Sequence, residues 1–100
     1  MIEVRQTAAF RKWFAKLRDI RSQAHIVRRI ERAQAGNLGD VKALGDGVSE
    51  MRIHYGAGYR LYLARRSERL VILLCGGDKS SQAADIRTAK AMAREYDDDA

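Results

Sequence analysis

The sequence predicts a small α+β domain in which a pair of helices packs on a mostly antiparallel sheet. Three observations support this fold class. Two stretches with helical spacing of apolar residues lie in the first 36 residues, an alternating stretch covers residues 49–63, and an apolar run covers residues 70–75. Helices followed by a run of strands are typical of α+β domains. The expected order is β-α-α-β-β-β-α, in a single domain over residues 1–96.

The first third of the chain is expected to hold one strand and two helices. Residues 2–5 alternate apolar and charged side chains, as strands do, and Thr7 is a suitable N-cap for a helix over about residues 7–17. Ser22 is the expected N-cap of the second helix, which ends near Gly36 and Asn37. The apolar faces are Phe10, Trp13, Phe14 and Leu17 in the first helix and Ile26, Val27, Ile30 and Ala33 in the second. Short helices joined by a few residues usually form an antiparallel pair.

An alternating stretch, after a segment at 39–47 that is expected to be irregular, predicts a β-hairpin that turns at Gly56-Ala57-Gly58. Glycines at a turn permit positive φ without steric cost. Successive side chains of a strand point to opposite faces. The face expected in the core carries Met51, Ile53, Tyr55, Tyr59, Leu61 and Leu63. The face expected to be exposed carries Glu50, Arg52, His54, Arg60 and Tyr62.

The last third is expected to hold an interior strand and a helix. Residues 70–75 are apolar on both faces, which is typical of a strand covered on both sides. Cys75 in this run is interpreted as a small buried hydrophobe. Ser80 or Ser81 is expected to cap the last helix. Residues 97–100 carry three aspartates at the C-terminal end of that helix, where negative charge is unfavourable, so this tail is expected to fray.

The charge balance is strongly basic. The chain has 19 Lys and Arg against 13 Asp and Glu, and without the three tail aspartates residues 1–96 carry 19 against 10, a net +9. Such a domain suggests an anionic partner, either nucleic acid or an acidic protein. No run has the length of a membrane span, and no secretion signal is visible. With one Cys and two His, no disulfide, metal or cofactor is expected, and the expected location is the cytoplasm.

The face with Arg52, His54, Arg60 and Tyr62 has two interpretations. Arginine forks match phosphate oxygens, aromatic rings stack on bases, and histidine can move a proton near neutral pH, so this face suits a phosphate-rich ligand. An antiparallel sheet also often has one solvated face with the same residue types. From the hairpin alone, the solvated face is the favoured interpretation.

Two motifs, together with the order of elements, favour the phosphate-binding interpretation over the solvated face. They are Met51-Arg-Ile-His-Tyr-Gly-Ala-Gly-Tyr-Arg-Leu-Tyr62 and Leu74-Cys-Gly-Gly-Asp-Lys-Ser-Ser-Gln82. With the expected fold, they resemble the RelE/ParE superfamily of bacterial toxins from type II toxin–antitoxin modules. The most similar branch is that of the HigB-like addiction module killer proteins. The resemblance covers the chain from Ile2 to about Arg94.

The resemblance implies a toxin neutralised by an antitoxin from the adjacent gene, one with a helix-turn-helix DNA-binding domain. It also implies a ribosome-dependent endonuclease that cuts mRNA without a metal ion and so inhibits translation. Carried over by position, Arg60 matches an arginine that contacts the scissile phosphate, and Arg52 and His54 match a basic pair in which one residue can act as general base. Lys79 lies near a basic residue that precedes the last helix in relatives. Arg52, Arg60, Tyr62 and Lys79 are the candidate RNA-binding residues.

One departure leaves alternatives open. RelE proper has a tyrosine near the start of its last helix, where this chain has only residues 81–85, Ser-Gln-Ala-Ala-Asp, so no proton donor is assigned. Three hypotheses therefore remain: a ribosome-dependent mRNA endonuclease, a ParE-like inhibitor of DNA gyrase without nuclease activity, and a nucleic-acid-binding relic without toxicity. His54 beside Arg52 and Arg60 favours the first.

Overall fold

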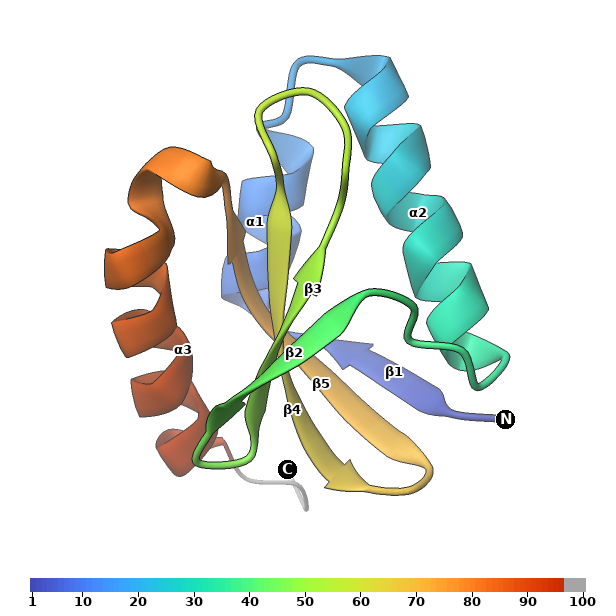
Figure 1. The fold of residues 1–100 in the computed structure, drawn as a ribbon. Coiled ribbons are helices and arrows are strands. Elements are labelled where there is room, and N and C mark those ends of the chain that lie inside the picture. Colours follow the sequence, from blue (N-terminus) through green and yellow to red (C-terminus); the bar gives the residue numbers. More distant parts are fainter. Residues whose placement is uncertain (97–100) are drawn as a thin grey trace.

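The computed structural model describes residues 1–96 and shows the expected α+β domain with one further strand (Figure 1). Its elements are β1 (Glu3–Gln6), α1 (Ala8–Ala15), α2 (Ile20–Gln34), β2 (Val41–Gly45), β3 (Val48–Arg52), β4 (Arg60–Ser67), β5 (Leu70–Gly77), the 3-10 turn η1 (Lys79–Ser81) and α3 (Gln82–Glu95). The predicted fold class is therefore confirmed.

The sheet has the strand order β1-β5-β4-β3-β2. β1 runs parallel to β5, and the other neighbouring strands are antiparallel. Figure 1 shows α1 and α2 on one face of the sheet and α3 on the other. This is the RelE-like topology that the resemblance implied, with the helical pair packed on one face.

Two apolar layers, one on each face of the sheet, form the core. Val71 and Leu73 of β5 contribute to the layer under α1 and α2, whereas Ile72 and Leu74 contribute to the layer under α3. The predicted interior strand is thus confirmed, because alternate side chains of β5 are buried on both sides. Fully burying a side chain of this size stabilises the fold by roughly 1.5–3 kcal/mol relative to exposure.

The segment that was expected to be irregular contains β2, an edge strand paired antiparallel with β3. Val41 lies opposite Met51, and the register shifts between Ala43 and Gly45. Val41 packs against the apolar layer under α1 and α2, whereas Leu44 packs against the layer under α3, so the two apolar residues of β2 lie on opposite faces. The sequence therefore shows no alternation that would have indicated a strand.

Helix caps were predicted with mixed success. Thr7 caps α1 as expected, since its hydroxyl accepts a hydrogen bond from the backbone N of Phe10 at 3.1 Å. The N-cap of α2 is Asp19 and not Ser22: its carboxylate accepts from the backbone N of Arg21 and from the Ser22 hydroxyl, both at 3.0 Å. Aspartate and serine cap equally well, so the residue type alone could not choose between them.

The face expected to be exposed is largely covered, because α3 lies on it. Glu50 and Tyr62 are 1% and 0% exposed, so the expectation that they face solvent was wrong. The buried residues of α3 are small, Ala89 and Ala93, which lets the helix approach the sheet closely. Only the end of this face that carries Arg52 and His54 stays accessible.

Two further expectations concern the chain as a whole. The predicted fraying of residues 97–100 lies outside the described residues. Within residues 1–96, no helix combines the length and apolar character needed to cross a membrane.

Gly76 and Gly77 at the end of β5 allow both helical layers to approach the sheet. A Cβ at Gly76 would collide with the Trp13 ring of α1, and a Cβ at Gly77 would collide with the Asp85 carboxylate of α3.

Gly76→Ala is therefore expected to destabilise the protein by about 1–3 kcal/mol, the usual cost of overpacking. Urea unfolding measures this. The double variant Trp13→Leu/Gly76→Ala removes the obstacle and should show a smaller cost of the alanine than the single variant does in the wild-type background. Equal costs in both backgrounds would contradict the proposed clash.

Candidate functional site

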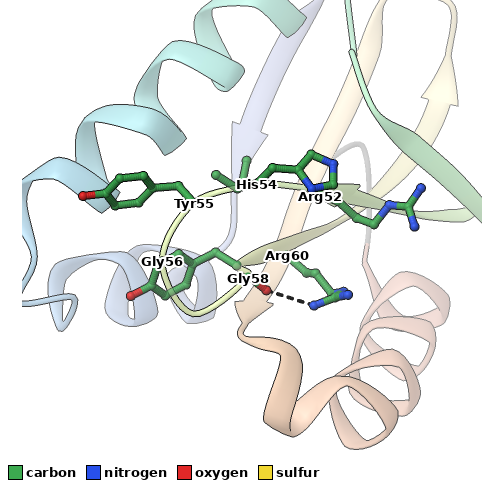
Figure 2. Close-up of a pocket in the computed structure, with 8 residues that line it drawn as sticks. Arg52, His54, Tyr55, Gly56, Gly58 and Arg60 are labelled. Carbon is green, nitrogen blue, oxygen red and sulfur yellow. Dashed lines mark hydrogen bonds between the residues drawn. The ribbon is translucent and has the colours of Figure 1, made fainter.

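A cavity of about 290 Å³ lies at the loop that joins β3 to β4 (Figure 2). It is lined by Arg52, Ile53, His54, Tyr55, Gly56, Gly58, Tyr59 and Arg60. Gly56 and Gly58 have φ angles of 59° and 73°, a left-handed conformation that side-chain-bearing residues adopt at a cost. The predicted glycine turn is thus confirmed, and three of the predicted site residues line one cavity.

Arg52 and Arg60 are direct cross-strand partners at the end of the β3–β4 pair. Like charges opposite each other normally destabilise a sheet. Here each arginine has its own carboxylate: Arg52 Nη2 lies 3.0 Å from Asp40, and Arg60 Nε lies 3.4 Å from Glu50. The two cations can therefore share this end of the sheet.

Asp40 contacts two of the predicted site residues at once. One carboxylate oxygen accepts a hydrogen bond from Arg52, and the other lies 2.5 Å from His54 Nε2. The hydrogen bond from Arg52, followed by that from His54, lowers the pKa of Asp40 below its ordinary value. An ionised carboxylate can only accept, so His54 Nε2 carries a hydrogen and Nδ1 of the neutral ring is the proton-accepting atom. Asp40 is a positioning residue that sequence reasoning missed, because it lies in the segment expected to be irregular.

Arg29 of α2 holds the backbone that carries these groups. Its guanidinium donates to the carbonyl oxygens of Leu38 at 3.1 Å, Asp40 at 3.3 Å and Arg52 at 2.5 Å. Burial lowers the pKa of Arg29, and nearby Arg32 adds to this effect, yet an arginine remains charged in proteins. A Cβ at Gly39 would lie 2.8 Å from the guanidinium, so a glycine there leaves room for this contact.

Arg60 is more enclosed than the sequence suggested. Its side chain is 13% exposed and the Glu50 side chain 2%. Its Nη1 donates to the carbonyl oxygen of Gly58 at 2.9 Å (Figure 2), and Gln82 of α3 donates to Glu50 at 2.9 Å. The expectation that Arg60 lies on an exposed face was therefore wrong. Arg60→Ala would leave the buried Glu50 carboxylate unpaired, at a cost of about 3–5 kcal/mol.

Lys79 and Tyr62, the two remaining candidates, differ in exposure to solvent. Lys79 is exposed at the start of η1, where its backbone N lies 3.4 Å from the carbonyl oxygen of Ala57, so it lies beside the loop. Tyr62 lies beneath α3, and its hydroxyl has no hydrogen-bond partner among residues 1–96. Burial, with Glu50 nearby, raises the pKa of Tyr62. Tyr62 therefore cannot stack on a base, and its assignment to RNA binding was wrong.

Metal-ligating side chains do not gather in the described part of the chain: no group of three or more His, Cys, Asp or Glu within residues 1–96 could hold a metal ion. Cys75 is buried, as expected. Burial, with Asp85 nearby, raises the pKa of its thiol to about 12, which makes this cysteine a poor nucleophile.

Comparison with known proteins gives the family. Residues 12–97 match the family described as phage derived protein Gp49-like (DUF891). The chain belongs to this Gp49-like family. A protein of Haemophilus influenzae, described as uncharacterized, is 50% identical over 94 residues, which cover 94% of this chain and 95% of that protein. No solved structure matches. The match to the Gp49-like family includes every residue of the cavity.

Asp40→Asn should destabilise the protein near pH 6, and the loss should shrink as the pH falls. The pKa of Asp40 is depressed in the folded state, so its stabilisation is complete above the unfolded pKa of about 3.9 and is lost as the pH falls through the lower folded value. Urea unfolding of both proteins near pH 6 and pH 3 measures this. Asp46→Asn, at a more exposed aspartate, is the matched control, with an expected change near pH 6 within about 0.5 kcal/mol. A pH-independent effect of Asp40→Asn would contradict the ionic role of Asp40.

Proposed function

We propose that the protein is the toxin of a type II toxin–antitoxin system, a ribosome-dependent mRNA endonuclease that inhibits translation without a metal ion. The observation that carries this proposal is the cluster of Arg52, His54 and Arg60 around one cavity, with Lys79 beside the same loop. Membership of the Gp49-like family is consistent with a RelE/HigB-like toxin. The net charge of +9 over residues 1–96 favours an anionic target such as RNA.

The chemistry is a transesterification within the RNA strand. The 2′-hydroxyl loses its proton and attacks the adjacent phosphorus, and the bond to the 5′-oxygen of the next nucleotide breaks. The products are a 2′,3′-cyclic phosphate and a 5′-hydroxyl. The protein has to accept one proton, stabilise the extra charge on the phosphoryl oxygens and return a proton to the leaving oxygen.

The geometry supports specific roles for the four candidates. Arg60 holds the scissile phosphate with the N–H groups that its contact to Gly58 leaves available. Arg52 assists from the opposite strand, and neither arginine transfers protons, since both stay charged. His54, 74% exposed and held by Asp40, accepts the proton of the 2′-hydroxyl through Nδ1. Lys79 stabilises the leaving group or the phosphate.

A test of Arg60 has to separate charge stabilisation from folding. Arg60→Lys keeps the pairing with Glu50 but loses the fork, and Glu50→Gln/Arg60→Ala removes both charges together. Both proteins should fold, and the double variant should cleave about 10²–10³-fold more slowly than Glu50→Gln alone, the cost of a lost oxyanion donor. The cleavage rate of Arg60→Lys should lie between the rates of Glu50→Gln and of the double variant. The measurement is mRNA cleavage on programmed ribosomes in the presence of a chelator.

A control variant and two further assays distinguish the possible outcomes of this experiment. Arg28→Ala changes an exposed arginine of α2, far from the cavity in sequence and absent from its lining, and should leave cleavage within a factor of about 2–3. Undiminished cleavage by a folded double variant would exclude Arg60 from the site. Wild-type protein that leaves mRNA intact but blocks supercoiling by gyrase would move the function to the ParE-like alternative, and no effect in either assay would favour the non-toxic relic.

His54 should contribute through proton transfer. His54→Ala is expected to slow cleavage by about 10²–10⁴-fold, the usual range of general acid–base help. Because the side chain is 74% exposed, the free energy of unfolding should change little. Single-turnover cleavage as a function of pH is the measurement. A His54→Ala protein with the wild-type rate and pH profile would remove His54 from the mechanism.

The proposed partner is an acidic antitoxin from the adjacent gene, one that carries a helix-turn-helix DNA-binding domain. The basic surface motivates this partner, and complex formation should weaken as salt screens the charges. Co-purification of the two gene products at low and high ionic strength tests it. Reproducible failure to form a complex at either ionic strength would remove the toxin–antitoxin proposal.

A further inference from the structure

The cavity at the β3–β4 loop has an aromatic side as well as a cationic side. Tyr55 and Tyr59 line it, and both pack against the apolar layer under α1 and α2. Figure 2 shows Tyr55 on the other side of the loop from Arg52 and Arg60. A ligand in this cavity would therefore meet rings on one side and guanidinium groups on the other.

Each tyrosine ring contacts an aromatic residue of the helical pair. Tyr55 stacks on His25 of α2, with ring centroids 4.2 Å apart and planes inclined by 24°. Tyr59 meets Trp13 of α1 edge to face, with centroids 6.1 Å apart. Rings fixed in this way lose little freedom when a planar group stacks on them. The aromatic side is thus prepared for a flat ligand.

The edge of the loop between the two sides carries no long side chain. It consists of Gly56, Ala57 and Gly58, and the two glycines have positive φ. A ligand can cross this edge and reach both the rings and the cations. The cavity volume of about 290 Å³ lies just below the usual range for small-molecule sites, a size that suits a single nucleotide.

We propose that this cavity is a nucleotide subsite, in which one base of an RNA strand packs against Tyr55 and Tyr59 while the attached phosphate binds Arg52 and Arg60. The assignment rests on the proposed function and adds to it a place for the base. Every base has a π-face, so the subsite accepts all four bases, with differences that follow their stacking strength.

Binding to the isolated protein tests the subsite without the ribosome. The probes are the four ribonucleoside 5′-monophosphates, with ribose 5-phosphate as the matched probe that lacks a base. NMR titration follows the ring signals of Tyr55 and Tyr59 and the guanidinium signals of Arg52 and Arg60. Nucleotides should bind about 5–150-fold more tightly than ribose 5-phosphate, the range that one base–aromatic stack supplies. Tyr59→Leu should reduce this ratio, whereas Tyr59→Phe, which keeps the ring, should preserve it.

A further probe separates an RNA strand from free nucleotides. A 2′-O-methyl trinucleotide cannot be cleaved by attack of its own 2′-oxygen, and it should bind more tightly than any mononucleotide. Equal binding of the two would assign the cavity to free nucleotides and overturn the RNA assignment. Equal binding of nucleotides and ribose 5-phosphate, or no binding of any probe, would overturn the base subsite. That comparison uses the wild-type protein, so it holds even if Tyr59→Leu does not fold.

Failure of the subsite and failure of the proposed function are distinguishable. If ribosomal cleavage depends on Arg60 but nucleotides and ribose 5-phosphate bind alike, the nuclease proposal stands and the base subsite falls. If the base-dependent binding is found but mRNA stays intact on ribosomes, the subsite stands and the nuclease proposal falls.

Discussion

The candidate site depends on a charge constraint: two arginines face each other across β3 and β4, and each needs its own anion. Asp40 reaches Arg52 from the segment before β2, whereas Glu50 reaches Arg60 from beneath α3. The two carboxylates differ in burial, 34% against 2% side-chain exposure, so the two pairs differ in character. A half-exposed pair adds little stability and leaves its arginine free to exchange partners. A buried pair is costly to break, so Arg60 is the fixed cation of the site and Arg52 the adaptable one.

Arg29 connects this charge arrangement to the helical pair. Three carbonyl oxygens from two separate segments converge on its guanidinium, and the carbonyl of Asp40 also accepts the backbone N–H of Arg52 at 3.0 Å. The position of Asp40 is therefore fixed both by Arg52 of β3 and by a residue of α2 that does not line the cavity. An opening of α2 from the sheet would remove the contact from Arg29 and leave the contacts from Arg52 in place. Helix packing thus supports the site geometry without being its sole support.

Much of the fold could be predicted because its signals are local. The alternation from Met51 to Leu63 correctly assigned the core face, and the apolar run of β5 correctly indicated burial on both sides. The placement of α3 could not be predicted, because the apolar residues of this helix do not indicate which face of the sheet it covers. Its position on the face with Glu50 and Tyr62 is what buries these two residues. Asp40 escaped notice because its partners are 12 and 14 residues away and its segment shows no period. The residues that line the cavity are close together in the sequence and could be recognised as one motif, whereas their ion pairs form only through the tertiary structure.

Different residues determine the electrostatic potential inside the site and the long-range potential of the whole domain. Within the site, the two arginines are matched by two acidic side chains, so their combined charge is close to zero and Lys79 supplies the excess. Opposite charges about 4 Å apart interact by about 4 kcal/mol at an effective dielectric constant near 20, which means that a phosphate entering the site competes with groups already bound to the arginines. Long-range attraction must then come from the basic surface outside the cavity, where residues 1–96 carry +9 overall. Under the proposed function, the site selects by donor geometry, because a planar fork held in place recognises the shape of a phosphate even when its charge is largely compensated.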